Sequence, residues 1–222
     1  MQSIALFSSI MQWLPPLLWG LLVTLQVAIL ASLLGICAGI FLGVLQCKKL
    51  KTPIIGRVIE AYILVIRGTP SYVQILIVYY ALPDLLGINL SPFVAGALAL
   101  GLNMGAYVSE IVRAGIDALP AGQWLASMAL GYSQLQAVFH IILPQGLKNV
   151  LPALVSEVVI VLKETSLLSM IGLLEMTRVG INIIARSMQP MTIYLLVACL
   201  YLAMTTIIDM IGKKIEKGLA HD

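Results

Sequence analysis

The stretch Gly122–Gln145, GQWLASMALGYSQLQAVFHIILPQ, lies between two strongly apolar segments and is too polar to cross a lipid bilayer. Its beginning, Ala121–Leu130, is rich in residues that favour helices, and Gly131 then interrupts the pattern. A second helical piece is predicted over about Ser133–Ile142, capped by its serine and closed by Pro144. The pattern indicates a short helix–turn–helix that projects from a membrane domain.

The composition supports a membrane location for the rest of the chain. Of 222 residues, 60% are hydrophobic and only 10% are charged, whereas soluble domains carry roughly 25% charged residues. The sequence therefore predicts an all-α polytopic membrane protein. The net charge of +3 is small and gives no sign of a nucleic-acid partner.

The apolar runs predict one domain of five transmembrane helices, because a span needs about 20 apolar residues. We expect residues 1–14 to form a separate interfacial helix and 175–189 to form an amphipathic segment at the outer mouth. Three glycines at four-residue spacing in the first span should let another helix approach closely; they are Gly35, Gly39 and Gly43. The predicted spans are 15–45, 54–82, 92–115, 151–174 and 190–211, with a loop over 118–148.

Basic residues set the predicted orientation, since short cytoplasmic loops are enriched in Lys and Arg. They gather after the first span, in the loop before the fourth and after the fifth. This arrangement puts the N-terminus outside, the C-terminus inside and the helix–turn–helix in the cytoplasm. The residues concerned are Lys48, Lys49, Lys51, Arg57, Lys148, Lys213, Lys214 and Lys217.

Charged side chains inside the spans are candidates for the solute pathway, because each costs about 2.5–3.5 kcal/mol at a helix centre. Glu157 and Glu164 are seven residues apart and share one helix face. Pro70 should kink the second span and free carbonyls that need a protein or water partner. The candidates are Arg67, Thr69, Asn103, Glu157, Lys163, Glu164, Thr165 and Ser166.

A structural reading of the same residues stays open. The charged members could pair with one another and hold helices together, and Asn103 could join two helices. Glu110 and Arg113, spaced i,i+3, are most simply an ion pair within one helix.

No motif indicates an enzyme. The chain has no G-x-x-x-x-G-K-[ST] loop for ATP and no G-x-S-x-G elbow. His140 and His221 are too few and too far apart for a metal site. Any energy from ATP must therefore enter through another subunit.

The helix–turn–helix resembles the "EAA" loop of permease subunits of binding-protein-dependent ABC importers. That motif runs Glu-Ala-Ala, three residues, Gly, nine residues, then Ile-x-Leu-Pro. Aligned on Gly131, this chain has Leu125 in place of Glu and Ser127 in place of the second Ala. The residues that match are Ala126, Gly131, Ile141, Leu143 and Pro144. Further similarities to the polar amino-acid branch are Arg67–Pro70, Tyr107–Gly115, Glu157 and Lys163–Leu167.

The resemblance implies a permease subunit of a histidine-, glutamine- or arginine-permease-like importer in the bacterial inner membrane. It implies a second permease subunit, identical or not, a cytoplasmic ATPase that binds ATP and Mg²⁺, and an external solute-binding protein. It also implies that the Gly122–Gln145 loop contacts the ATPase. The residues expected to serve this coupling are Gln123, Leu125, Ala126, Met128, Gly131, Leu135, Phe139, Leu143 and Pro144.

Two other classes of function remain as alternatives. The intramembrane charges would also suit a carrier or channel driven by an ion gradient, but such carriers commonly show internal repeats, and five spans do not divide into halves. A non-transporting assembly factor or a membrane enzyme would leave the helix–turn–helix motif without a role.

Overall fold

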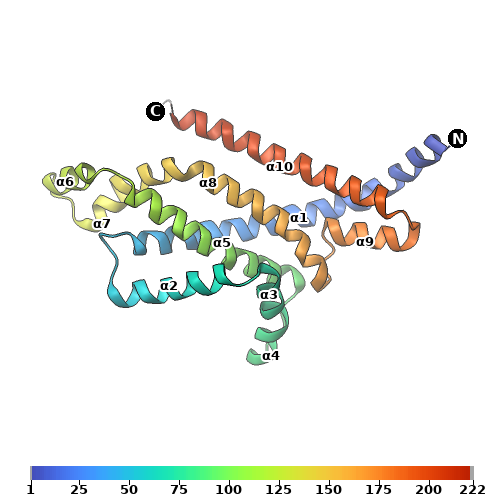
Figure 1. The fold of residues 1–222 in the computed structure, drawn as a ribbon, viewed down its shortest axis with the longest axis horizontal. Helices are drawn as coiled ribbons and strands as arrows, with labels where there is room; N and C mark the ends of the chain where they lie inside the picture. The colour runs from blue at the N-terminus through green and yellow to red at the C-terminus, as the bar shows by residue number, and fades with distance from the viewer. Residues whose placement is uncertain (1, 221–222) are drawn as a thin grey trace.

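The computed structural model describes the backbone of residues 2–220 and the side chains of residues 10–218. The described residues form helices and no strand, arranged as an elongated bundle (Figure 1). The elements in chain order are α1 (Gln2–Gln46), α2 (Pro53–Gly68), α3 (Ser71–Leu76), η1 (Ile77–Ala81), α4 (Leu82–Leu86), α5 (Pro92–Asp117), α6 (Ala121–Ala129), α7 (Gln134–Ala137), η2 (Val138–Ile142), α8 (Leu143–Glu164), η3 (Thr165–Ile171), α9 (Met176–Ser187) and α10 (Pro190–Ala220).

The packing of α1 against α5 forms the centre of the bundle. A Cβ atom added at Gly39 would lie 2.4 Å from Val108, and one at Gly35 would lie 2.7 Å from Met104. Gly43 likewise faces α5, so all three glycines of the predicted stripe lie against this helix. The predicted close approach of a second helix is confirmed, and the partner is α5 of the same chain.

Three helices are long and apolar enough to cross a membrane, namely Ile10–Gln46, Pro92–Asp117 and Pro190–Gly218. A fourth candidate is the pair Pro53–Gly68 and Ser71–Leu86, which is bent by 108°. The predicted second span, 54–82, thus consists of two helices, because Pro70 breaks the helix instead of kinking it.

The predicted fourth span, 151–174, also has different bounds. Here α8 begins at Leu143 and ends at Glu164, and the chain goes on as the 3₁₀ helix η3 to Ile171. By length and composition α8 is not among the candidate spans, so the described residues offer three or four and not the predicted five.

The N-terminal segment differs from the prediction as well. α1 runs without interruption through Pro15 and Pro16, so a separate interfacial helix over residues 1–14 is wrong for the described residues. The prolines lie near one end of the helix, and the carbonyls they leave without donors belong to Met11 and Gln12, both exposed residues. Water or lipid headgroups can hydrogen-bond such carbonyls, which lowers the cost of the two prolines.

The predicted helix–turn–helix forms as expected in its first part. α6 ends at Ala129, and Gly131 adopts φ +83°, a conformation that favours glycine. Ser133 caps α7 in a reciprocal capping box with Gln136. However, Pro144 does not close the second piece: η2 continues directly into α8. The π-helical hydrogen bond from Leu143 N to Val138 O, just before the proline, lets the helix continue past it.

The predicted amphipathic segment forms α9, which packs against α1 and α10. Fully buried Glu175 caps α9 by accepting hydrogen bonds from the backbone N–H groups of Thr177 (2.8 Å) and Arg178 (2.7 Å). The Tyr201 hydroxyl on α10 donates to the same carboxylate at 3.1 Å. Burial raises the pKa of Glu175, and the capping hydrogen bonds oppose this effect.

Candidate substrate pathway and coupling surface

The break between α2 and α3 is held by one buried amide. Pro70 has no N–H, so the carbonyl of Ile66, four residues earlier, loses its helical donor. The Gln74 side chain takes that place: its Nε2 donates to Ile66 O at 2.7 Å and lies 2.8 Å from Thr69 Oγ1. Thr69 Oγ1 in turn donates to Val65 O at 2.8 Å. The break therefore has its own hydrogen-bonding partner, the buried side chain of Gln74.

Long-range hydrogen bonds tie this break to two other helices. Asn103 on α5 is buried, and its Nδ2 donates to Gln74 Oε1 at 2.9 Å. The Ser71 hydroxyl, at the start of α3, donates to Glu164 Oε1 at 2.9 Å. The predicted structural role of Asn103 as a link between helices is confirmed. The contacts also bring together α3, α5 and the end of α8.

A small cavity of about 150 Å³ opens between α5 and α8, and we call it the inner cavity. It brings together three of the predicted pathway residues, Asn103, Glu157 and Glu164. Within residues 10–218, neither glutamate has an ion-pair partner within 4.0 Å. The residues that line it are Asn103, Met104, Tyr107, Glu157, Ile160, Val161 and Glu164.

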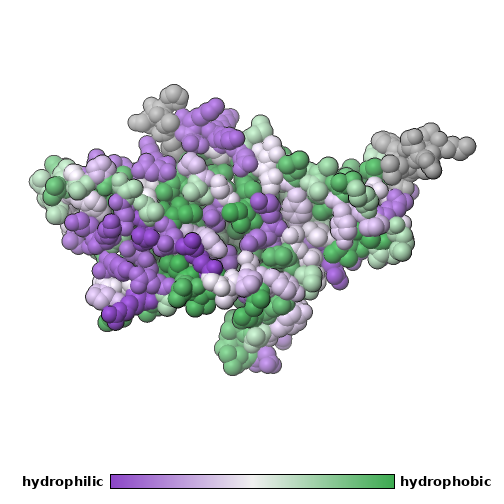
Figure 2. Space-filling view, viewed as in Figure 1, coloured by the Kyte–Doolittle hydropathy of each residue, from purple (hydrophilic) through white to green (hydrophobic). Residues whose placement is uncertain are grey.

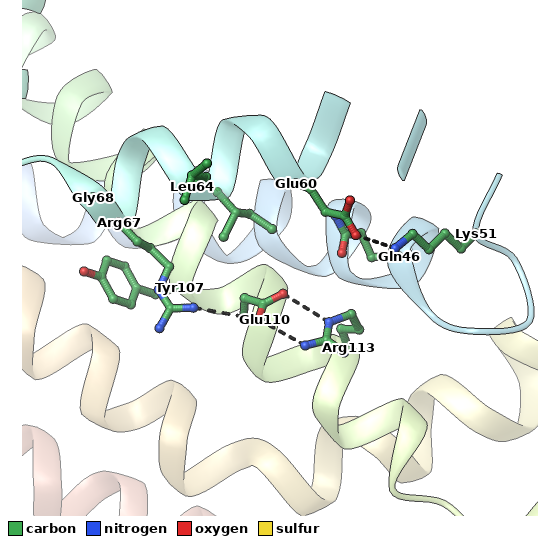
Figure 3. Close-up of a pocket in the computed structure, with 10 residues that line it drawn as sticks. Gln46, Lys51, Glu60, Leu64, Arg67, Gly68, Tyr107, Glu110 and Arg113 are labelled. Carbon is green, nitrogen blue, oxygen red and sulfur yellow. Dashed lines mark hydrogen bonds and ion pairs between the residues drawn. The ribbon is translucent and has the colours of Figure 1, made fainter. Parts of the chain in front are cut away.

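A larger cavity of about 700 Å³ lies between α2 and α5, and Tyr107 lines both cavities. Arg67 Nη1 lies 3.7 Å from Glu110 Oε2, and its guanidinium lies 5.2 Å from the centre of the Tyr107 ring (Figure 3). The structural reading supposed that the charged residues of the pathway set pair with one another. Arg67 instead pairs with Glu110, and not with Glu157 or Glu164. The large cavity is lined by Gln46, Lys51, Glu60, Ile63, Leu64, Arg67, Gly68, Tyr107, Glu110 and Arg113.

The remaining predicted pathway residues do not line either cavity. Lys163 is exposed on α8. Thr165 is buried and its hydroxyl donates to Leu162 O at 2.7 Å, while the Ser166 hydroxyl donates to Lys163 O at 2.8 Å. The hydroxyls of this segment are therefore engaged by the preceding helical turn.

The helix–turn–helix presents apolar side chains to its surroundings. Leu125 is 65% exposed, Met128 50%, Leu135 58% and Phe139 58%. Trp124, Ala137 and Val138 face inwards and hold the loop to the bundle. Of the other predicted coupling residues, Ala126, Gly131 and Pro144 are exposed, whereas Gln123 and Leu143 are half-buried.

Figure 2 shows that hydrophilic residues gather over the half of the molecule that carries α6 and α7, while hydrophobic residues prevail around α3 and α4. Apolar helices around cavities lined by charged groups are typical of membrane transport proteins. Comparison with known proteins identifies its family. The sequence pattern of the family described as "Binding-protein-dependent transport system inner membrane component" matches residues 35–221, and the chain belongs to this family.

Similar proteins agree with this assignment. A "Putative glutamine transport system permease protein GlnP" of Rickettsia conorii is 38% identical over 90% of this chain and 91% of the relative. The "Arginine transport system permease protein ArtQ" of Bacillus subtilis is 35% identical over 96% of each chain. A solved structure described as "Crystal structure of an amino acid ABC transporter with histidines" has a TM-score of 0.85 at 36% identity, covering 95% of this chain and 97% of that chain.

The predicted family is thus confirmed, and the chain is a permease subunit of an ABC importer. It is a transport component, and ATP hydrolysis belongs to a separate subunit in such importers.

Sequence reasoning does not assign Gln74 or Tyr107 to the site, and it gives Glu110 only an ion pair with Arg113. A usable signal for Gln74 was present: it is a polar residue in an apolar run, four positions after Pro70, where a helical side chain can reach back over the break. The Arg67–Glu110 pair joins residues 43 positions apart, so no local sequence pattern predicts it.

Proposed function

We propose that the chain carries amino acids across the membrane as part of an ATP-driven importer. The observation that supports this most directly is the inner cavity, where Glu157 and Glu164 lie together with Asn103 and lack a cationic partner among the described residues. Carboxylates in such a place would bind an ammonium or a cationic side chain. The relatives named for glutamine and arginine, and the structure described with histidines, suggest the same class of solute.

The other end of an amino acid is a carboxylate, and Arg67 is the residue proposed to receive it. Its guanidinium makes only a 3.7 Å contact with Glu110, whose two oxygens already accept from Arg113 at 3.0 and 3.1 Å. Donors of Arg67 therefore stay available in the large cavity, which shares Tyr107 with the inner cavity that holds the glutamates. We place Thr69, Lys163, Thr165 and Ser166 along the wider pathway, where they would border moving solute.

The proposed topology keeps five passes, with the N-terminus outside and the C-terminus inside the inner membrane of a bacterium. In support, the two ends of the chain lie at opposite ends of the bundle, and the C-terminus lies at the end that carries α6 and α7 (Figure 1). The predicted fourth pass would be made by α8 together with η3.

The proposed partners are a second permease subunit, a solute-binding protein outside and an ATPase that binds ATP and Mg²⁺ inside. The loop 118–148, here called the coupling loop, would contact the ATPase through its exposed Leu125, Met128, Leu135 and Phe139. Burial of such a group in a groove of the ATPase would supply the hydrophobic part of the binding free energy.

Reconstitution tests the proposal. The permease with its ATPase and binding protein is placed in liposomes, and uptake of labelled arginine, histidine and glutamine is measured with and without ATP. We expect ATP-dependent uptake that falls at least about tenfold in Glu164→Gln. Glu216→Gln, the same change at an exposed site on α10, should transport normally. Uptake by the permease without the ATPase would favour an ion-driven carrier and contradict the proposal.

A further inference from the structure

A run of alternating charges connects the coupling loop to the helix break. Asp117 ends α5, four residues before α6 begins at Ala121. Its Oδ2 lies 3.6 Å from Arg113 Nη1, and Arg113 donates to both carboxylate oxygens of Glu110 at 3.1 and 3.0 Å. Glu110 Oε2 then lies 3.7 Å from Nη1 of Arg67, the residue directly before the Gly68–Pro70 break. Figure 3 shows the Arg67–Glu110–Arg113 part of this run.

The coupling loop is rooted in a rigid part of the molecule. The last turns of α5 and the first turns of α8 flank the loop. These two helices pack too closely to slide past one another. A Cβ at Gly115 would lie 2.4 Å from Val150 and 2.9 Å from the carbonyl of Gly146. Asp117 also accepts from the backbone N–H of Lys48 at 3.1 Å, which joins the end of α1 to the same body. A displacement of the loop would therefore carry α5 and its charges with it.

α2 is attached to α5 by fewer contacts than α1 or α8. Besides apolar packing, they include the Tyr62 Oη–Leu102 O hydrogen bond and, through Gln74, the link from the break to Asn103. The buried apolar contacts of α2 are a small cluster in which Ile59 and Ile63 meet Ala106 of α5. Most of its other apolar side chains are exposed, for example Leu64 at 75% and Val65 at 60%. The pair Arg67–Glu110 is the one member of the charge run that crosses between helices, and at 3.7 Å it is looser than the bidentate Arg113–Glu110 pair. It can separate and re-form when α2 shifts.

We propose that Glu110 is a positioning residue for coupled transport. Glu110 is held by Arg113 on the rigid body, and it faces Arg67 beside the break. The position of the end of α2 therefore depends on the position of the coupling loop. ATP-driven movement of the loop then changes the wall of both cavities through Arg67 and Tyr107. The inference rests on the proposed function, because it concerns how the same pathway is opened.

The test uses the full importer in liposomes, with ATP hydrolysis and solute uptake measured in the same preparation. In Glu110→Gln we expect uptake per ATP hydrolysed to fall about tenfold, while hydrolysis stimulated by the binding protein changes less than about twofold. Glu110→Asp should restore part of the lost uptake per ATP hydrolysed, and Glu216→Gln should keep the normal value.

A double-mutant cycle with Arg67→Gln separates this role from a general loss of structure. If the two residues act through each other, the double variant is no more uncoupled than the more affected single variant. The inference would be overturned if the two single substitutions lowered uptake per ATP by factors that multiply in the double variant. Equal losses of hydrolysis and uptake in Glu110→Gln would overturn it as well. If instead the unmodified importer carries no amino acid, it is the proposed function that fails.

Discussion

The chain contains two interrupted helices, one at Gly131 in the coupling loop and one at Pro70 beside the inner cavity, and they are built differently. The turn at Gly131 is open: a Cβ there would meet nothing within 4 Å, and apolar side chains around it are exposed. The break at Pro70 recruits Gln74, and through it Asn103 from another helix. Residues 67–70 are exposed as well, and a Cβ at Gly68 would also meet nothing within 4 Å, so the difference lies in the hydrogen bonds. The turn at Gly131 closes with backbone groups alone, whereas the carbonyl freed by Pro70 in an apolar span needs a side-chain partner.

The largest expected effect concerns the open turn. Gly131→Pro replaces a residue at φ +83° by one fixed near −65°, and it removes the N–H that donates to Met128 O at 3.0 Å. We expect ATP-dependent uptake to fall to background while membrane insertion stays normal. Gly131→Asn is the matched control, because asparagine tolerates this conformation, and it should retain most activity. Normal uptake by the proline variant would show that the turn has no part in coupling.

The break at Pro70, held by the buried side chains of Gln74 and Asn103, should respond in stability before activity. Gln74→Leu leaves Ile66 O and Asn103 Nδ2 without their partner, and we expect a loss of about 3 kcal/mol in the free energy of unfolding. The measurement is denaturant unfolding of the purified permease in mild detergent. Adding Asn103→Leu should restore part of the loss, since one of the two orphaned groups is then removed. A double variant less stable than Gln74→Leu would argue against the hydrogen-bonded break.

A smaller effect tests whether the exposed apolar surface near Gly131 binds a partner. Leu135→Ala should weaken the association with the ATPase by about tenfold, because a buried anchor side chain is truncated. Leu195→Ala is the matched control: Leu195 on α10 is 53% exposed, close to the 58% of Leu135, but lies away from the coupling loop. Affinity is measured by titrating the purified ATPase onto the permease. Equal effects of the two substitutions would remove the distinction between the coupling loop and the lipid-facing surface.

The two interruptions also show what the sequence can predict. Around Gly131 the signals are local: a glycine, a serine cap with Gln136 three residues on, and helical spacing on each side, so this part was predicted almost correctly. The glycine stripe on α1 was read correctly for the same reason. Around Pro70 the sequence predicted a kink, but not its 108° bend nor the contacts from Asn103 and Ser71–Glu164, because distant segments supply them.

The errors at the ends of elements have a related cause. The sequence predicts helix boundaries at Pro15, Pro16 and Pro144, yet each proline lies within or at the start of a helix. A proline removes one donor, and whether that ends a helix depends on what the freed carbonyl meets. At Pro15 and Pro16 the helix continues because the surroundings near Met11 are exposed, and at Pro144 it continues through the π-helical turn before Leu143. Neither feature can be predicted from the proline itself.

The smallest expected effect tests most directly whether a segment is stabilised by local contacts or by long-range packing. Ser133→Ala removes the side chain that accepts from Gln136 N at 3.3 Å, which should cost about 1 kcal/mol of local stability. Hydrogen exchange should therefore speed up about fivefold for the α7 amides alone. Ser91→Ala, which removes the cap of the 26-residue α5 at Val94 N (3.3 Å), should change exchange only at the first turn, because long-range packing holds α5. If exchange in the inner-cavity wall also rises in Ser133→Ala, the two interruptions are coupled more tightly than their contacts indicate, and the contrast between them loses its physical basis.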